Sequence, residues 1–240
     1  ALHFFIVDDL FGQQRDETIR FCTMLGDYQQ RIATRLDLTV QIRLDKAGDS
    51  QLLMAMRQAG INAVAIGYES HIDEELQAMN KRLKAKEMIA QTRIFHKLGF
   101  LVHGMFIFGY PKHEGIKSDI SLEEMVKRYR QFIREANIDT IQVLLPIPLP
   151  GTEFRQRLKS QNRIYSLECV GWQYYDGNFP LFEPDAPLTA EQLQDSIRKI
   201  KGKFYRFHYM FLIGLNALSF TTMIFYLHNI KAGWRRWYRN

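Results

Sequence analysis

The sequence predicts an α/β protein in which parallel strands alternate with helices. Short apolar segments rich in β-branched and aromatic residues alternate with longer segments of helical period along the 240 residues. Each connection between two strands is long enough to hold a helix, as parallel strands require. Segments such as AVAIG and IQVLL are largely apolar on both faces, which is typical of a covered sheet. The pattern fits either a doubly wound sheet or a (β/α) barrel.

The expected elements follow in order along the chain. The expected strands are 3–7, 38–43, 62–67, 101–108 and 139–145. The expected helices cover about 15–29, 49–59, 73–79, 85–98 and 121–136. Asp49 and Ser50 precede the second helix and Gly60 follows it, which are ordinary start and stop signals. Ser121 and Glu124 form a capping box before the last of these helices.

A distinctive polar or turn element follows each expected strand. These elements are Asp8-Asp9, Arg43 with Asp45, Glu69-Ser70, Gly109-Tyr110-Pro111, and Pro146 through Thr152. The carboxyl ends of parallel strands form the edge where such folds bind ligands. Strands that all contribute to one rim favour a barrel, because ligand groups of an open sheet gather at one switch point. No G-x-G-x-x-G follows a strand and G-x-x-x-x-G-K-[ST] is absent, which disfavours dinucleotide and P-loop proteins.

Six segments together resemble a known family. They are FFIVDDLF, VQIRLD, AGINAVAIGYES, LQAMNK, GFLVHGMFIFGYP and LLPIPLPGTEF. In this order they are similar to the second through sixth strands of radical S-adenosylmethionine (SAM) enzymes, most of all to the branch with an N-terminal cobalamin-binding domain. The resemblance implies a partial (β/α) TIM-type barrel and a 4Fe–4S cluster held by three cysteines in C-x₃-C-x₂-C, with SAM bound to the cluster. It also implies an enzyme that cleaves SAM reductively to start radical chemistry.

The chain departs from this family in its cysteines. It contains no C-x₃-C-x₂-C, and Cys22 and Cys169 are fewer thiolates than a cluster needs. The chain by itself is therefore expected to hold no metal. In the family, the motif follows the first strand, upstream of the segment that resembles residues 3–11. We therefore expect a C-terminal fragment, inactive alone, whose first strand, cluster loop and any corrinoid domain lie upstream. The alternatives are a degenerate noncatalytic binding module and a cluster-free TIM-type enzyme acting on a phosphorylated or sugar substrate.

The resemblance implies SAM contacts along the carboxyl edge. The candidate cofactor-binding residues are Asp9 for the amino group, Arg43 for the carboxylate, Glu69 and Ser70 for the ribose side, and Gly109 and Pro148 beside the adenine. Each has a structural alternative: Arg43 could pair with Asp45 or Glu69, Ser70 could cap the next helix, and Gly109 could serve close packing. The catalytic residues are unknown. His103, on an otherwise apolar strand, is either an acid–base candidate or a satisfied core histidine.

Two further features concern the substrate side. Met105, Ile107 and Val143 are expected to line an apolar lumen that protects a radical. Residues 160–188 lack regular periodicity and are rich in aromatic residues, which suits a lid or the floor of a substrate pocket. Ordinary packing under a long loop is the alternative.

The C-terminal segment differs from the rest of the chain. Residues 1–187 form the expected barrel part, and 188–240 form helices, the first of which begins at Thr189. Residues 209–227 carry no formal charge and reach the minimum length of a spanning helix. Basic residues crowd the end of the chain among Trp234, Trp237 and Tyr238, which favours a membrane surface over nucleic acid. A helix docked on the barrel is the alternative.

These features define the expected function. The leading reaction is cobalamin-dependent transfer of a methyl group from SAM to an unactivated carbon of a lipid-like substrate, with cobalamin in an upstream domain. Rearrangement, cyclisation and methylthiolation remain open. An electron donor such as flavodoxin or ferredoxin is the expected partner. Two isolated cysteines suit a reducing compartment, so the expected location is the cytoplasm, at the inner face of its membrane.

Overall fold

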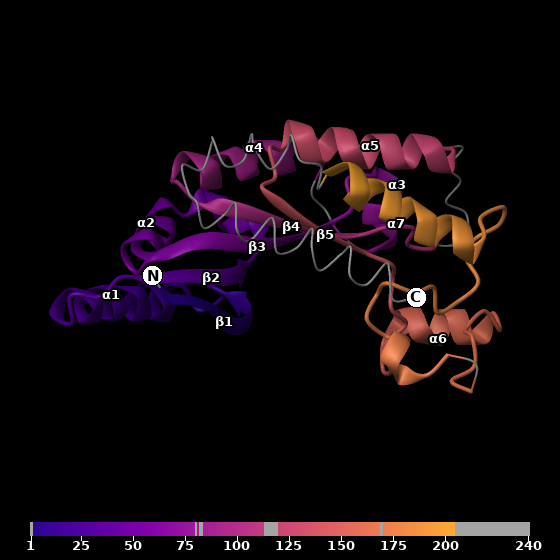
Figure 1. Cartoon of the computed structure of the whole chain (residues 1–240), viewed down its shortest axis with the longest axis horizontal. Helices are drawn as coiled ribbons and strands as arrows, with labels where there is room; N and C mark the ends of the chain where they lie inside the picture. The colour runs from indigo at the N-terminus through magenta and orange to yellow at the C-terminus, as the bar shows by residue number, and fades with distance from the viewer. Residues whose placement is uncertain (1, 80, 82–83, 113–119, 169, 205–240) are drawn as a thin grey trace.

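The computed structural model describes residues 2–79, 81, 84–112, 120–168 and 170–204. Five parallel strands form one sheet in the order β1-β2-β3-β4-β5 (Figure 1). They are β1 (Leu2–Phe11), β2 (Leu36–Ile42), β3 (Ile61–Glu69), β4 (Leu101–Ile107) and β5 (Thr140–Leu144). The expected α/β architecture with parallel strands is confirmed. The sheet is not closed and therefore corresponds to part of a TIM-type barrel.

Helices connect the strands. They are α1 (Arg15–Arg31), η1 (Leu44–Gly48), α2 (Ser50–Gln58), α3 (Asp73–Ala78), α4 (Ala85–Lys97), α5 (Leu122–Glu135), α6 (Glu153–Ser160), η2 (Trp172–Tyr174) and α7 (Ala190–Phe204). Helices α4, α5 and α7 lie together along one side of the sheet, whereas α6 lies apart from them (Figure 1). Asp49 caps α2 through Leu52 N–H at 3.0 Å, and Ser121 caps α5 through Glu124 N–H at 3.3 Å.

The two faces of the sheet differ in burial, because successive side chains of a strand point to opposite sides. Val40, Val64 and Val102 point toward the helices and are fully buried. The opposite side, here called the inner face, carries mostly half-buried or exposed side chains. It is formed by Thr39, Gln41, Ala65, Gly67, His103, Met105, Ile107, Thr140, Gln142 and Leu144.

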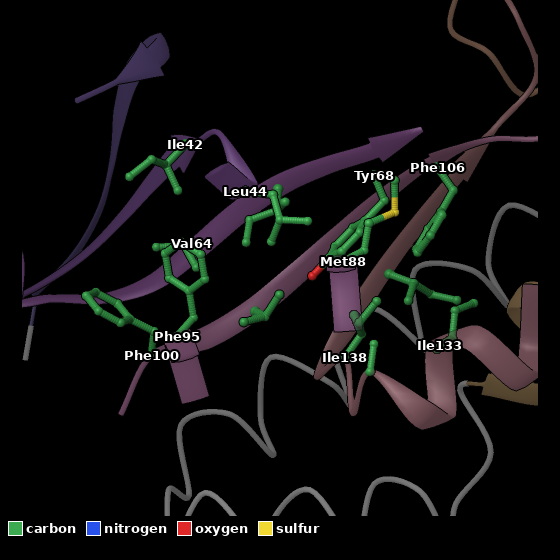
Figure 2. Packing of buried hydrophobic residues seen from close by; sticks show 14 of the residues in the cluster. Ile42, Leu44, Val64, Tyr68, Met88, Phe95, Phe100, Phe106, Ile133 and Ile138 are labelled. Atoms are coloured by element: carbon green, nitrogen blue, oxygen red, sulfur yellow. The ribbon is translucent and has the colours of Figure 1, made fainter. Parts of the chain in front are cut away.

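The main hydrophobic core lies between the sheet and its helices. Tyr68 of β3 and Phe106 of β4 stack with their ring centroids 5.4 Å apart. Phe132 of α5 meets both rings edge-on, and Figure 2 shows Met88 and Ile133 approaching from the helices. This packing fixes one face of each strand and leaves the inner face for other contacts.

A smaller second core lies beyond β5. Leu158 of α6 packs there with Leu181 and Phe182, and residues around Ile164 and Phe182 form an antiparallel bridge. The segment expected to be irregular therefore folds around its own core and contains one 3-10 turn, η2.

The β1 side of the sheet is an exposed edge. Its side chains Phe4, Phe5 and Val7 are 50%, 51% and 90% exposed. Helix α1, which follows β1, has an exposed apolar stripe at helical spacing, formed by Phe21, Met24, Tyr28 and Ile32. An apolar strand edge beside an apolar helix stripe is a surface on which a further strand and helix could pack.

Within the described residues, no helix is long and apolar enough to cross a membrane. The expected helix 209–227 lies outside the described residues.

Candidate functional site

Glu69 ends β3 in an unusual backbone conformation. Its φ is +62°, and the N–H of Ser70 donates to the carbonyl oxygen of Tyr68 at 2.8 Å. A hydrogen bond around one residue of positive φ is the mark of the strained form of the γ-turn. The pairing with β4 also shifts between Gly67 and Glu69, so a β-bulge lies at the same place. Bulges and strained residues are both concentrated at functional sites, where they redirect side chains.

The Glu69 carboxylate lies over the backbone of Gly67. A Cβ atom built on Gly67 would be 2.7 Å from Glu69 Oε1, so the carboxylate occupies the space of the absent side chain. Because Gly67 pairs with Met105 on the inner face, Glu69 faces that side of the sheet. Lys81 Nζ lies 3.6 Å from Oε1, and the Glu69 side chain is 25% exposed. A half-buried carboxylate beside an ammonium group can bind hydroxyl and charged groups of a ligand.

Ser70 and Glu75 form a buried pair directly after this turn. Ser70 Oγ donates to Glu75 Oε2 at 2.5 Å and accepts from the N–H of Ile72 at 3.0 Å. Burial raises the pKa of Glu75 to about 7, and the hydrogen bonds from Ser70 and Tyr129 lower it only in part. Ser70 therefore binds the N–H of Ile72, the N-cap residue of α3, but is not itself the cap that one alternative expected. The raised pKa means that Glu75 changes charge near neutral pH.

Tyr129 of α5 completes this buried cluster. Its hydroxyl lies 2.7 Å from Glu75 Oε2, 3.0 Å from Ser70 Oγ and 2.9 Å from the carbonyl oxygen of Ile107. Burial is the main reason why the pKa of Tyr129 is well above its usual value, so the hydroxyl keeps its proton. Ser70, Glu75 and Tyr129 are here called the Ser70 network.

The other candidate charges lie nearer to β1 and β2. Asp8 and Asp9 are exposed, and Asp8 Oδ1 accepts from the N–H of Leu10 at 3.1 Å. Arg43 donates from Nη2 and Nε to the two carboxylate oxygens of Asp45 at 2.5 and 3.2 Å. Of the two partners considered from the sequence, Arg43 therefore has Asp45. This pair is exposed, and such pairs are weak enough to yield to a ligand.

The carboxyl edge thus carries separate groups rather than one charge cluster. Glu69 pairs with Lys81, and Arg43 pairs with Asp45. Among the described residues, no ion pair joins Asp9, Arg43 and Glu69. Asp9 lies near the end of β1, Arg43 follows β2 and Glu69 ends β3, so a ligand that reaches all three must extend across the edge from β1 to β3.

Gly109 and Pro148 occupy tightly packed positions. Gly109 has a φ of +76°, and a Cβ atom there would lie 2.8 Å from Leu193 Cδ2 of α7. Close packing therefore explains this glycine without a ligand. Pro148 is buried, and its carbonyl oxygen accepts from Arg155 Nη1 at 2.9 Å.

His103 lies half-buried on the inner face. Its Nδ1 is 2.7 Å from Thr140 Oγ1 of the neighbouring strand. Burial lowers the pKa of His103 to about 4, so the imidazole is neutral at physiological pH. His103 is both a hydrogen-bonded residue and one that faces the side where a substrate would lie.

The apolar lining of the inner face differs from expectation at one residue. Met105 and Ile107 lie on this face, as expected. Val143 is fully buried on the helix side, where it pairs with Phe106, so its expected place in the lumen is wrong. A strand that is apolar on both faces does not reveal which face is which, and Leu144 takes the lumen position instead.

The aromatic segment 160–188 lies against the end of β5. The N–H of Leu145 donates to the carbonyl oxygen of Gly177 at 2.8 Å. A Cβ atom at Gly177 would lie 2.9 Å from the Leu144 side chain, so the loop packs against the inner face at this end. Trp172 remains 56% exposed. The position is compatible with either expected role, a pocket floor or loop packing.

The residues present do not fit an iron–sulfur cluster. Cys22 is fully buried in the core, and burial raises the pKa of its thiol to about 12, which disfavours the thiolate that binds metal. Across the part of the chain that the structure describes, no group of three or more His, Cys, Asp or Glu side chains could hold a metal ion. The chemistry of the edge does fit a nucleoside cofactor such as SAM, since the half-buried Glu69 carboxylate can accept hydrogen bonds from hydroxyl groups.

The sequence did not identify two residues of the site. Tyr129 occupies an apolar position of an amphipathic helix and resembles a core residue. Glu75 lies in the first turn of α3, where acidic residues are common for helix stability alone. Lys81 ends the segment LQAMNK, and nothing in that segment indicates its contact with Glu69.

The parallel strands, the helices that connect them and the polar carboxyl edge define the chain as an α/β protein of the TIM-barrel type. A search of family models found no match. The hopanoid C-2 methylase of Rhodopseudomonas palustris (strain TIE-1) is 26% identical over 161 residues, 67% of this chain and 29% of that protein. The anaerobic magnesium-protoporphyrin IX monomethyl ester cyclase of Cereibacter sphaeroides is 22% identical over 211 residues, 86% of this chain and 32% of that protein. The chain thus spans about a third of the length of these curated relatives.

Solved structures give the same fold. The radical S-adenosylmethionine methyltransferase TsrM from Kitasatospora setae, solved with cobalamin and a 4Fe–4S cluster, matches with a TM-score of 0.54 and 16% identity, over 67% of this chain and 31% of that one. Elp3 from Methanocaldococcus infernus also matches with a TM-score of 0.54 and 16% identity, over 85% of this chain and 55% of that one. The resemblance seen in the sequence is therefore confirmed: this chain is a relative of radical SAM enzymes, cobalamin-dependent methyltransferases among them.

Proposed function

We propose that this chain is the carboxyl-terminal part of a radical SAM enzyme and that its carboxyl edge binds SAM. The main support is the Glu69 turn. It places a carboxylate over the backbone of Gly67, at the edge where parallel α/β folds bind ligands, on a fold shared with a SAM-dependent methyltransferase. When bound to a reduced cluster that donates one electron, SAM would supply an organic radical able to abstract a hydrogen atom.

The proposed role of this chain is to bind and orient. Glu69 would accept hydrogen bonds from the cofactor, and Arg43 would exchange its exposed pairing with Asp45 for the cofactor's carboxylate. Asp9 would meet the amino group. Ser70 belongs to the buried network behind Glu69, while Gly109 and Pro148 would shape the backbone near the base.

The cluster ligands would come from outside the chain described. We propose that an upstream strand pairs with β1, carrying the cluster loop, and that an upstream helix packs on the stripe of α1. The exposed residues Phe4 and Phe5 on the strand, and Phe21 and Met24 on the helix, support this arrangement. A partial barrel over residues 1–187, followed by a helical segment 188–240, is part of the proposal.

Methyl transfer to a lipid-like substrate is the preferred reaction. One curated relative is named a hopanoid C-2 methylase, and a structural neighbour is a cobalamin-bound methyltransferase. The half-buried Met105, Ile107 and Leu144 give the inner face an apolar part that suits such a substrate. The proposal also includes cobalamin in an upstream domain, an electron donor such as flavodoxin, and a membrane surface as partner.

Cyclisation is the second candidate. It is favoured by the similarity to a magnesium-protoporphyrin ester cyclase, which extends over 86% of the chain. The aromatic segment around Trp172 could stack on a planar substrate.

The test uses the full-length protein with its upstream sequence, purified without oxygen. Under reducing conditions it is expected to release 5′-deoxyadenosine, and to transfer label from methyl-labelled SAM to a lipid extract. Glu69→Gln should weaken SAM binding, whereas Glu123→Gln, an exposed change on α5, serves as the matched control. Absence of both SAM binding and a brown chromophore would refute the proposal. It would favour the cluster-free enzyme or the noncatalytic module, and nucleoside formation without methyl transfer would favour cyclisation.

A further inference from the structure

We propose that the Ser70 network is a positioning device that holds the Glu69 turn, and with it the carboxylate, ready to bind the nucleoside cofactor. Ser70, Glu75 and Tyr129 contact no ligand themselves in this arrangement, because all three are buried on the far side of the turn. Only the identity of the ligand that Glu69 binds rests on the proposed function.

The turn needs such support. A glutamate with a φ of +62° is in a sparsely populated conformation that persists only when its surroundings enforce it. Ser70, the next residue, is fixed on both sides. Its N–H binds Tyr68, and its hydroxyl binds both Glu75 and the N–H of Ile72. If Ser70 moved, the hydrogen bond that closes the turn around Glu69 would break.

Tyr129 fixes Ser70 and Glu75 to the sheet. Its hydroxyl is within hydrogen-bond distance of both side chains and of the carbonyl oxygen of Ile107, the last residue of β4. The ends of β3 and β4 therefore meet α3 and α5 at one buried point, with the Glu69 turn directly beside it. Side chains in such a network act together, so removal of one hydroxyl should loosen the turn as a whole.

Amide hydrogen exchange tests the positioning without any ligand. In Tyr129→Phe, the Ser70 amide is expected to exchange about tenfold faster, because the strained turn is no longer enforced. Tyr68→Phe is the matched control: it removes a buried hydroxyl from the neighbouring residue, but that hydroxyl binds Thr92 at 2.6 Å and not the network. Equal exchange at Ser70 in both variants would overturn the inference. If Tyr129→Phe does not fold, Ser70→Ala takes its place.

Cofactor binding tests the consequence in the full-length protein. The dissociation constant of SAM is expected to rise about tenfold in Tyr129→Phe, but not further when Glu69→Gln is already present. Equal weakening in both backgrounds would mean that Tyr129 stabilises the fold without positioning Glu69. A wild-type protein that binds no SAM would refute the proposed function instead, and the exchange result would still decide whether the network holds the turn.

Discussion

Replacing Glu75 by glutamine should change how the stability of the protein depends on pH. Burial raises the pKa of this carboxyl from 4.5 to about 7, so the native state holds its proton more tightly than the unfolded chain does. Stability from this group is complete below pH 4.5. This contribution is lost progressively as the pH rises to about 7, and above that pH the group adds no stability.

The size of the effect follows from the two pKa values. The difference between about 7 and 4.5, at ~1.4 kcal/mol per pH unit, corresponds to about 3 kcal/mol of unfolding free energy. Glutamine cannot ionise, yet its carbonyl oxygen can still accept from Ser70 and Tyr129. The wild type should therefore lose about 3 kcal/mol of unfolding free energy between pH 4.5 and 7 that Glu75→Gln keeps.

Urea unfolding of both proteins at several pH values measures this difference. Burial lowers the pKa values of His71 and His103 to about 4, so each adds stability as the pH rises from about 4 to 6.5. Those contributions are present in both proteins and cancel when the two curves are subtracted. A difference that stays constant from pH 4.5 to 7.5 would show that Glu75 does not titrate in this range.

Three other predictions concern the carboxyl edge. Gly67→Ala should displace the Glu69 carboxylate, because the new Cβ atom would lie 2.7 Å from Oε1, and calorimetry should show weaker SAM binding with little change in melting temperature. Gly109→Ala should destabilise the protein by about 1–3 kcal/mol in denaturant unfolding, because it combines a positive φ with a contact of 2.8 Å to Leu193. Arg43→Gln should change stability by less than about 1 kcal/mol, because its ion pair is exposed, but should weaken SAM binding. Normal SAM affinity in Gly67→Ala or Arg43→Gln, or unchanged stability in Gly109→Ala, would count against the respective argument.

The sequence predicted the order and type of the elements because the chain follows local rules here. Asp49 and Ser121 cap helices where expected, since a cap acts on the turn beside it. The first strand is longer than expected: it continues through Asp8 and Asp9 to Phe11 because its pairing with β2 resumes after an irregularity. Charged residues alone do not reveal such a continuation.

The site was only partly predictable for a different reason. Glu69 was found because it follows a strand, and the carboxyl ends of parallel strands meet at one edge. Tyr129 could not be identified in this way, because its role depends on which helix crosses the ends of β3 and β4. Val143 was assigned to the wrong face, since a strand apolar on both sides has no pattern from which to choose. Contacts between distant segments decide these features, and no single segment contains them.

The exposed edge of β1 has a practical consequence for anyone who expresses this chain alone. Its backbone N–H and C=O groups on that side, flanked by Phe4 and Phe5, form a template on which another copy can add a strand. The exposed apolar stripe of α1 adds a second surface that promotes association. Expression trials should therefore include chains that carry the proposed upstream strand. Precipitation of this chain alone would then indicate an unpaired β1 edge rather than a failure to fold.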